Sequence, residues 1–252
     1  MTLRLFVPDP LRAGVELALP DAAARHARVR RVQPGQWLRL FDGSGCDWPA
    51  EVLAVGRQRV DVRVGTPQAG LREMALHITV AIAMPANERM DVLVEKATEL
   101  GVATIQPLHS ERSVLRLSGA RADRKRAHWQ AIAQAACEQC GRAVVPQVAA
   151  VRDWADWLHG LQPPPGAGAR WLLSLQPGAT PVAAQGLPAG LLCTLSGPEG
   201  GLTQDEEAAA RAAGFVAVDL GPRVLRAETA PLALLAWAGL SESNDAPMPQ
   251  PD

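Results

Sequence analysis

Two segments near the C-terminus decide the fold: residues 195–203 read LSGPEGGLT and residues 220–230 read LGPRVLRAETA. Each follows a short apolar run, at 191–195 and at 215–220, that is typical of a buried strand, and each leads into a helix-like segment. Glycines let the backbone approach a bound group closely, and the start of a helix offers unpaired N–H donors. This order of strand, glycine-rich loop and helix therefore indicates a ligand site.

The helix after the first loop has a well-marked start. Thr203 and Glu206 stand at the spacing of a capping box, in which each side chain bonds the backbone N–H of the other residue. The alternative interpretation of each loop is an ordinary tight turn of an α/β domain. Two such loops in succession, the second carrying Arg223, Arg226 and Glu228, favour a binding site instead.

The composition bounds the kind of protein. The chain has 252 residues, 48% of them hydrophobic, which is enough for a real core and for two domains. No apolar run approaches the roughly 20 residues that span a bilayer, and the N-terminus lacks the long apolar region of a signal peptide. The four cysteines are too few for a secreted disulfide framework. We therefore expect a cytoplasmic protein with no membrane partner.

The charges are segregated along the chain although the net charge is only −1. Residues 1–73 hold eleven Arg against eight Asp or Glu, and residues 110–145 hold seven Arg or Lys against three. Residues 153–252 hold four basic and eleven acidic residues. Such segregation suits a protein that places one basic face against a phosphate backbone, although a solvated surface of mixed charge is the alternative.

The N-terminal part has the pattern of a small β domain. Short runs rich in β-forming residues are separated by turn signals, which is typical of a compact barrel. The predicted elements are a strand at 3–7, a helix at 21–31, and strands at 37–41, 48–55 and 60–64. Residues 66–73 contain Pro and Gly, and we expect them to form the linker.

From residue 76 onward strands and helices alternate, which predicts a parallel sheet. The predicted elements are a strand at 77–84, a helix that Asn87 caps and Gly101 ends, a strand at 102–108, helices at 122–140 and 151–161, a strand at 171–175, and a last helix at 229–240. Residues 163–168 (PPPGAG) are expected to form a loop. The chain after residue 241 is rich in Pro and polar residues and is expected to be disordered.

Several other functions lack their motifs. The sequence contains no P-loop, and its glycines do not have the dinucleotide-binding GxGxxG spacing. Cys137 and Cys140 form a CxxC pair late in a predicted helix, with no second pair at ligand spacing, so a structural role is favoured over redox chemistry or zinc binding. The five histidines are scattered, so we expect no metal and no serine-hydrolase triad.

Taken together, the motifs resemble those of the bacterial small-subunit ribosomal RNA uridine N3-methyltransferases (RsmE), which belong to the SPOUT class. The two C-terminal loops are the most specific part of the resemblance. The other matching segments are RLFV at 4–7, HARVRRVQPG at 26–35, FDGSG at 41–45, EKATELGV at 95–102, PLHSERSV at 107–114, and EQCGR at 138–142 followed by VP at 145–146. The chain departs from the pattern at Leu5, where Tyr is common, and at Arg30, where Leu is usual.

The resemblance implies an α/β fold with two domains. Residues 1–72 would form a PUA-like β-barrel that binds RNA, residues 73–242 a SPOUT parallel-sheet methyltransferase domain threaded into a trefoil knot, and residues 243–252 a disordered tail. Strand and helix patterns alone predict an unknotted doubly wound sheet, because knots are rare. The resemblance also implies a homodimer, with S-adenosylmethionine bound in the knotted loops and the 16S rRNA of the small ribosomal subunit as substrate.

The resemblance, together with the loop pattern, assigns candidate site residues. Those expected to bind S-adenosylmethionine are Leu173, Leu175, Leu195, Ser196, Gly197, Pro198, Glu199, Gly200, Gly201, Leu220, Gly221, Arg223, Leu225, Arg226 and Thr229. For catalysis we expect Glu228 near the uridine N3 proton and Arg226 beside a phosphate or the uracil oxygens. Those expected to bind RNA are Arg4, Arg12, His26, Arg28, Arg31, Arg112, Arg116, Arg124 and Arg142.

Three alternatives stay open at this point. The first is a SPOUT enzyme that acts on another RNA position, a ribose 2′-oxygen or a guanine nitrogen. The second is an RNA-binding module without catalysis, whose glycine loops are only turns. The third is a redox protein built on the CxxC pair. If the loops hold the cofactor, Gly200→Val is expected to abolish its binding by blocking the approach of the backbone.

Overall fold

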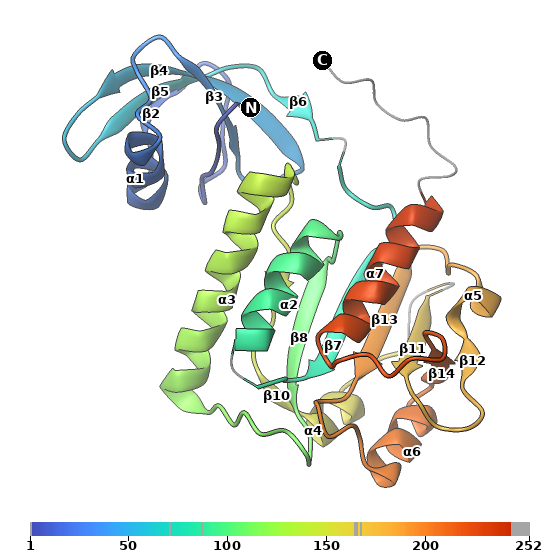
Figure 1. Ribbon diagram of the computed structural model, residues 1–252. Coiled ribbons are helices and arrows are strands. Elements are labelled where there is room, and N and C mark those ends of the chain that lie inside the picture. Colours follow the sequence, from blue (N-terminus) through green and yellow to red (C-terminus); the bar gives the residue numbers. More distant parts are fainter. Residues whose placement is uncertain (1, 71, 87, 164–165, 167, 243–252) are drawn as a thin grey trace. The chain divides into compact units, whose positions relative to one another are not determined.

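The computed structural model describes residues 2–70, 72–86, 88–163, 166 and 168–242. It divides into two compact units (Figure 1). The N-terminal unit consists of the chain up to Glu73 together with Gln134–Val145, and the larger C-terminal unit consists of the remainder. The sequence pattern had assigned 134–145 to the second domain. The predicted cap at Asn87, part of the PPPGAG loop and the tail at 243–252 lie outside the described residues.

The N-terminal unit is built on a six-stranded sheet (Figure 1). Its strands are β1 (Arg4–Phe6), β2 (Glu16–Ala18), β3 (Trp37–Phe41), β4 (Cys46–Val55), β5 (Val60–Val64) and β6 (Gln68–Ala69), and its helix is α1 (Asp21–Val29). The order is β1-β3-β4-β5-β2, with β6 paired to β4. The predicted β domain is confirmed. The sequence pattern missed β2 and β6, which are too short to show an alternation of apolar residues.

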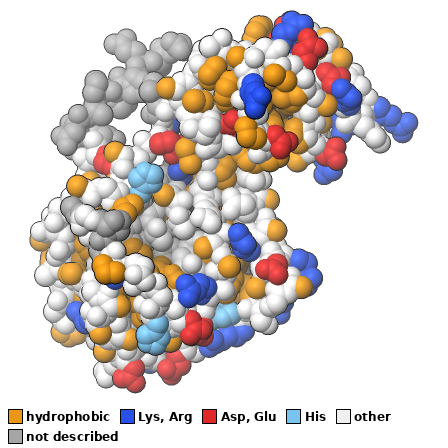
Figure 2. Space-filling view, turned by 180° about the vertical axis from the view of Figure 1, so that it is seen from behind, with side chains coloured by type: hydrophobic (Ala, Val, Ile, Leu, Met, Phe, Trp, Pro, Cys, Tyr) orange, Lys and Arg blue, Asp and Glu red, His pale blue; other side chains and the backbone are white. Residues whose placement is uncertain are grey.

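Period-two alternation fills the core of this unit. Leu38 and Leu40 of β3 and Val62 of β5 are buried on one face of the sheet. α1 packs on that face through three alanines, Ala23, Ala24 and Ala27. The exposed side of α1 carries arginine, and Figure 2 shows basic side chains, all of them arginines in this unit, at the end where the β4–β5 turn lies in Figure 1.

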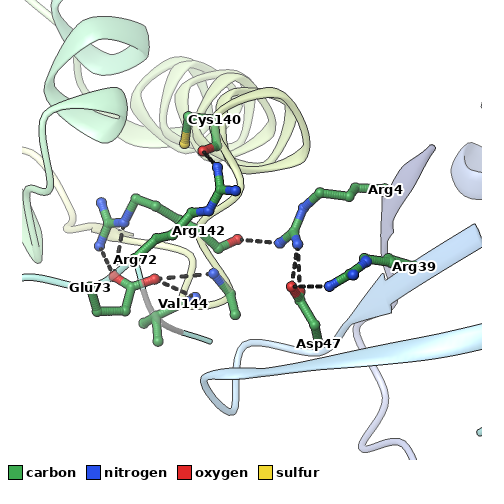
Figure 3. Close-up of polar contacts among 9 residues, drawn as sticks. Arg4, Arg39, Asp47, Arg72, Glu73, Cys140, Arg142 and Val144 are labelled. Carbon is green, nitrogen blue, oxygen red and sulfur yellow. Dashed lines mark hydrogen bonds and ion pairs between the residues drawn. The ribbon is translucent and has the colours of Figure 1, made fainter. Parts of the chain in front are cut away.

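Gln134–Val145 is fastened to the N-terminal unit by charges that are largely buried (Figure 3). Arg4 Nη1 lies 2.6 Å from Asp47 Oδ1, and Arg4 Nη2 donates to the carbonyl oxygen of Arg142 at 3.0 Å. The Arg142 guanidinium donates to Glu73 Oε2 at 2.9 Å, and Glu73 Oε1 accepts the N–H of Val144. The side chains of Arg4 and Arg142, expected from the sequence to bind RNA, are only 10% and 5% exposed, so both arginines are structural here.

The C-terminal unit is an α/β layer structure with a wholly parallel sheet, as predicted. The strand order is β10-β8-β7-β13-β11-β14-β12, with β9 paired to β8 (Figure 1). The strands are β7 (His77–Ala83), β8 (Thr104–His109), β9 (Gln147–Val148), β10 (Arg152–Asp153), β11 (Ala169–Leu173), β12 (Thr180–Pro181), β13 (Leu191–Ser196) and β14 (Val216–Asp219). The helices are α2 (Glu88–Glu99), α3 (Gly119–Cys140), α4 (Trp154–His159), α5 (Val182–Gln185), α6 (Gln204–Ala212) and α7 (Thr229–Glu242), of which α3 belongs to this unit only as far as Ala133.

Both faces of this sheet are covered, which explains the continuous apolar runs of its strands. Ala81 and Ala83 of β7 belong to a cluster with Trp154 of α4 and Ala210 of α6. The alternate residues of β7, including Ile82, are fully buried on the other face. α2 and α7 pack against each other, and α7 also contacts β13.

One predicted helix is shorter than expected. The sequence pattern predicts a helix at 151–161, whereas residues 152–153 form β10 and only 154–159 are helical. Asp153 ends the strand and caps α4, because its carboxylate accepts the N–H of Ala155. Within the described residues no helix is both long and apolar enough to cross a membrane. The trefoil knot stays a prediction.

Candidate active site

A pocket of about 560 Å³ lies at the carboxyl ends of β11, β13 and β14. Three loops line it, and each follows one of these strands: 173–176, 196–202 and 220–227. In parallel sheets ligands bind at this edge, because loops from neighbouring strands converge there. The two glycine-rich segments that are about twenty residues apart in the sequence therefore face one pocket.

The first glycine loop is tightly folded on itself. The carbonyl oxygen of Pro198 accepts the N–H of Gly201 at 2.9 Å, and Gly201 has φ +68°, a left-handed conformation that favours glycine. A Cβ at Gly197 would lie 3.0 Å from backbone atoms of Gly201 and Leu202. A side chain at Gly197 would therefore push this backbone aside by a few tenths of an ångström.

Two arginines hold the outside of this loop. Arg112 Nη1 donates to the carbonyl oxygens of Gly200 at 2.9 Å and of Leu202 at 3.4 Å. On the other side Glu199 Oε1 accepts the N–H of Ala86 at 2.9 Å and lies 3.0 Å from Arg89 Nη1. The loop is thus anchored to the segment after β8 and to the start of α2, and its backbone is fixed before any ligand arrives.

The predicted capping box at the start of α6 is confirmed. Thr203 Oγ1 accepts the N–H of Glu206, and Glu206 Oε2 accepts the N–H of Thr203. The second oxygen of Glu206 accepts the N–H of Glu111 at 2.8 Å. Glu206 therefore joins the glycine loop's helix to the same segment that carries Arg112.

The walls of the pocket are mostly apolar with a few polar groups. The apolar part consists of Leu173, Leu175, Leu202, Val218, Leu220, Val224, Leu225, Ala227 and Ala230. Ser174 and Glu207 are the polar part from β11 and α6, and the Ser174 hydroxyl donates to Glu207 Oε2 at 2.9 Å. Apolar walls with a small number of polar groups are typical of a small-molecule site.

Two buried polar groups near the pocket have no hydrogen-bond partner among the described residues. Ser196, at the end of β13, lines the pocket, and its hydroxyl oxygen is buried. Glu228 is 9% exposed, and its Oε2 is buried. A buried polar atom without a partner costs free energy, so such atoms mark places where a ligand or water completes the site.

The second loop supplies exposed cations. Arg223 and Arg226 line the pocket, are exposed, and have no side-chain hydrogen bond or ion pair with another described residue. The N–H groups of Thr229 and Ala230 donate to the carbonyl oxygen of Arg226, which begins α7. The two guanidinium groups are therefore available to an anionic ligand.

The pocket brings together most of the expected cofactor residues. Twelve line it: Leu173, Leu175, Ser196, Gly197, Pro198, Glu199, Gly200, Gly201, Leu220, Arg223, Leu225 and Arg226. Leu195 lies in the hydrophobic core, and Gly221, Thr229 and Glu228 border the pocket in sequence without lining it. The lining residues that were not expected to bind the cofactor are Arg89, Arg112, Ser174, Gln176, Leu202, Glu207, Val218, Val224, Ala227 and Ala230. Of these, only the residues next to the two glycine-rich loops in the sequence could have been found from the sequence alone.

The residues expected to bind RNA have different environments. Arg112 clamps the glycine loop, and Arg116 Nη2 donates to the carbonyl oxygen of Glu111. His26 Nδ1 lies 2.9 Å from Glu138 Oε2. Arg4 and Arg142 have largely buried side chains. The remaining members of the set are Arg12, Arg31 and Arg124, which are exposed, and Arg28, which is half-buried.

The CxxC pair has a structural environment. Cys137 is buried in α3 beside Phe41 and Ala143, and all four cysteines are free. Burial raises the pKa of the Cys137 thiol to about 12, which removes its thiolate at neutral pH. Among the described residues no three His, Cys, Asp or Glu side chains gather as a metal site would need.

Comparisons with known proteins identify the family. Residues 72–239 match the family model of the RNA methyltransferase domain, and residues 19–65 match that of the RNA methyltransferase PUA domain. A ribosomal RNA small subunit methyltransferase E from Mycobacterium bovis is 34% identical over 248 residues, which are 97% of this chain and 94% of the relative. The chain belongs to the ribosomal RNA small subunit methyltransferase E family.

Solved structures of similar proteins contain the cofactor. A ribosomal RNA small subunit methyltransferase E from Neisseria gonorrhoeae, bound to S-adenosylmethionine, is 37% identical with a TM-score of 0.87, and the match covers 94% of this chain and 96% of that one. A Legionella pneumophila protein in complex with the same cofactor is 29% identical with a TM-score of 0.89, covering 96% and 98%. As a member of this family, the protein is an RNA methyltransferase with a PUA domain and a parallel-sheet catalytic domain.

Proposed function

We propose that the protein transfers the methyl group of S-adenosylmethionine to the N3 atom of a uridine in the 16S rRNA of the small ribosomal subunit. The observation that carries the proposal is the convergence of the two glycine-rich loops on one pocket, in a chain that is 37% identical to a protein solved with this cofactor. The relatives' names give the small-subunit rRNA as their substrate.

The residues of the pocket fit the cofactor. Leu173, Leu175, Leu220 and Leu225 offer apolar surface for the adenine, and the backbone of the first glycine loop offers donors and acceptors. The Ser196 hydroxyl, which has no hydrogen-bond partner among the residues described, is a further polar group at this surface. S-adenosylmethionine supplies an activated methyl group on its sulfonium, so the protein has only to orient the acceptor and manage its proton.

Glu228 and Arg226 are the proposed catalytic residues. A neutral imide is a poor nucleophile, so the uridine N3 proton must leave as the methyl is transferred. Glu228 has a buried carboxylate oxygen without a hydrogen-bond partner among the described residues, at the start of the helix that borders the pocket, and we propose that this oxygen takes the proton. Arg226, exposed in the pocket two residues earlier, stabilises negative charge on the uracil oxygens or holds a phosphate.

The RNA reaches the pocket as an unstacked base. Leaving the stack costs a few kcal/mol, so single-stranded or distorted sites are favoured, and phosphate contacts offset the cost. Arg12, Arg31, Arg116 and Arg124 are exposed and remain the proposed contacts from the initial set. We further propose the homodimer and the cytoplasmic location that the family resemblance implies.

The test is methyl transfer to defined ribosomal particles. Purified protein is titrated calorimetrically with S-adenosylmethionine and then incubated with labelled cofactor and small subunits from a strain that lacks the corresponding enzyme. Binding, followed by one labelled uridine whose N3-methyl group stops reverse transcription, supports the proposal. Label on a ribose oxygen or a guanine indicates another RNA position, and absence of cofactor binding indicates a non-catalytic RNA-binding module.

A further inference from the structure

A cluster of arginines lies at the C-terminal end of α1 and on the β4–β5 turn of the N-terminal unit. We infer that this cluster, called here the α1 arginine surface and made of Arg25, Arg28, Arg30, Arg31 and Arg57, binds the phosphate backbone of the RNA substrate. The inference rests on the proposed function. Arg28 and Arg31 are already expected to bind RNA, and the inference joins them with the neighbouring arginines of the helix and of the turn into one surface. Three of its members, Arg25, Arg30 and Arg57, are absent from the residues expected to bind RNA.

The two chain segments of this surface are joined directly. Arg28, on the last turn of α1, donates through Nη1 to the carbonyl oxygen of Arg57 and through Nε to that of Ala24 at 3.2 Å. The turn itself is closed by the N–H of Gly56, which donates to the carbonyl oxygen of Arg59 at 2.7 Å. Arg28 therefore holds the helix end and the turn together as one surface.

The arginines of this surface have no carboxylate partners among the described residues, unlike Arg4, Arg39 and Arg63 of the sheet. Arg25, Arg30, Arg31 and Arg57 are exposed, and their side chains make no hydrogen bond or ion pair with another described residue. On the sheet, by contrast, Arg4 and Arg39 pair with Asp47, and Arg63 pairs with Glu16 and Glu51. Clustered like charges without counter-charges repel each other, and an anionic partner would relieve this repulsion.

The backbone at Arg31 gives an independent argument. α1 ends in a Schellman motif: the N–H of Val32 donates to the carbonyl oxygen of Ala27, and the N–H of Arg31 donates to that of Arg28. In this motif the residue at the Arg31 position adopts a left-handed conformation and is usually glycine. Arg31 has φ 56° and is the one non-glycine residue with positive φ among those described.

An L-residue in that conformation is strained, and glycine would relieve the strain. Keeping an arginine there costs stability and gains nothing inside the protein, because the side chain has no partner among the described residues. Strain of this kind is typical of functional positions. What the protein gains from Arg31 is one more guanidinium group on this surface. The planar guanidinium matches the geometry of phosphate oxygens.

The charges of the surface fit RNA better than a protein partner. Four of its guanidinium groups have no partner among the described residues. Asp61, the acidic residue that follows the turn in the sequence, is already paired with Arg59 at 2.6 Å. Figure 2 shows basic side chains, which are all arginines in this unit, at the end that carries the β4–β5 turn. A polyanion with regularly spaced phosphates satisfies several such groups at once.

The decisive variant is Arg31→Gly, because it separates stability from binding. It is expected to raise the Tm of the protein by relieving strain, and at the same time to weaken binding to small-subunit rRNA transcribed in vitro several-fold. A second variant, Arg30→Gln/Arg57→Gln, removes two charges without touching the Schellman motif. Its slope of log Kd against log salt is expected to fall by about one for each phosphate that the variant no longer neutralises.

Arg63→Gln is the matched control, because it also removes one positive charge from the same sheet unit but at a site already paired with Glu16 and Glu51. If the surface variants bind rRNA with the affinity and salt slope of Arg63→Gln, the inference is overturned. Failure of the proposed function has a different signature: the wild type would then not bind S-adenosylmethionine or transfer methyl, whatever the surface variants do to RNA affinity.

Discussion

Arg112 Nη1 lies 2.9 Å from the carbonyl oxygen of Gly200, although the two residues are 88 positions apart in the sequence. The same nitrogen lies 3.4 Å from the carbonyl oxygen of Leu202. One guanidinium therefore fixes two peptide planes of the loop that is proposed to bind the cofactor. The sequence pattern predicts that Arg112 binds RNA, whereas in the structure this side chain shapes the pocket.

Arg112→Ala is expected to weaken S-adenosylmethionine binding about five- to tenfold. The loss corresponds to about 1 kcal/mol for a hydrogen bond to a charged donor near the surface. Calorimetry measures the change, and Arg116→Ala is the control, because Arg116 belongs to the same segment but donates only to Glu111. A raised Kd for RNA with an unchanged Kd for S-adenosylmethionine would instead show that Arg112 contacts the RNA.

Gly197→Ala is expected to destabilise the protein by about 1–3 kcal/mol, because its Cβ would lie 3.0 Å from the loop's own backbone and would force it to shift. Gly200→Ala is the control. Its Cβ would only touch the Arg112 side chain, at 3.4 Å, so the fold should tolerate it. Denaturant unfolding measures both. The predicted loss of cofactor binding in Gly200→Val would then act by displacing Arg112, and equal stability of Gly197→Ala and Gly200→Ala would contradict this role of Gly197.

The segment that carries Arg112 is expected to loosen as the pH falls. His109 Nε2 accepts the N–H of Leu117 at 3.0 Å, which requires that nitrogen to be unprotonated. Burial, followed by the nearby Arg116, lowers the pKa of His109 below 6.5, and Asp153 opposes the shift. A lowered histidine pKa gives stability that is fully present above 6.5 and is lost as the pH falls through the folded-state pKa.

The measurement for His109 is Tm against pH between about 5 and 7.5, for the wild type and for His109→Gln. Glutamine keeps an acceptor for Leu117 but does not titrate. The wild type is expected to lose stability relative to the variant at the acidic end. Parallel curves would show that His109 does not contribute.

Glu228→Gln is expected to lower kcat by a factor of about 10²–10⁴, the range of general acid–base catalysis. The Kd for S-adenosylmethionine should stay the same, because Glu228 does not line the pocket. Single-turnover methyl transfer measures the first quantity and calorimetry the second. Glu88→Gln, at an exposed position of α2, is the control for an ordinary loss of charge. Normal turnover in Glu228→Gln would restrict Glu228 to a structural role.

The sequence by itself determined the features that depend on neighbouring residues. The strands of the parallel sheet follow from continuous apolar runs, and the capping box follows from the spacing of Thr203 and Glu206. The structural role of Cys137 follows from its place late in a helix. The two glycine loops were also recognisable, because the need for glycine is local: it comes from backbone conformation and close approach.

The tertiary structure decided what depends on contacts between distant segments. It assigned 134–145 to the N-terminal unit, where Arg142 pairs with Glu73 and Arg4 with Asp47, and so removed two arginines from the RNA-binding set. It also left Arg31 strained at a helix end, without a partner among the described residues. An arginine has the same sequence signal whether it meets a carboxylate, a carbonyl oxygen or solvent. Only folding brings its partner within hydrogen-bond distance, and that partner determines its role.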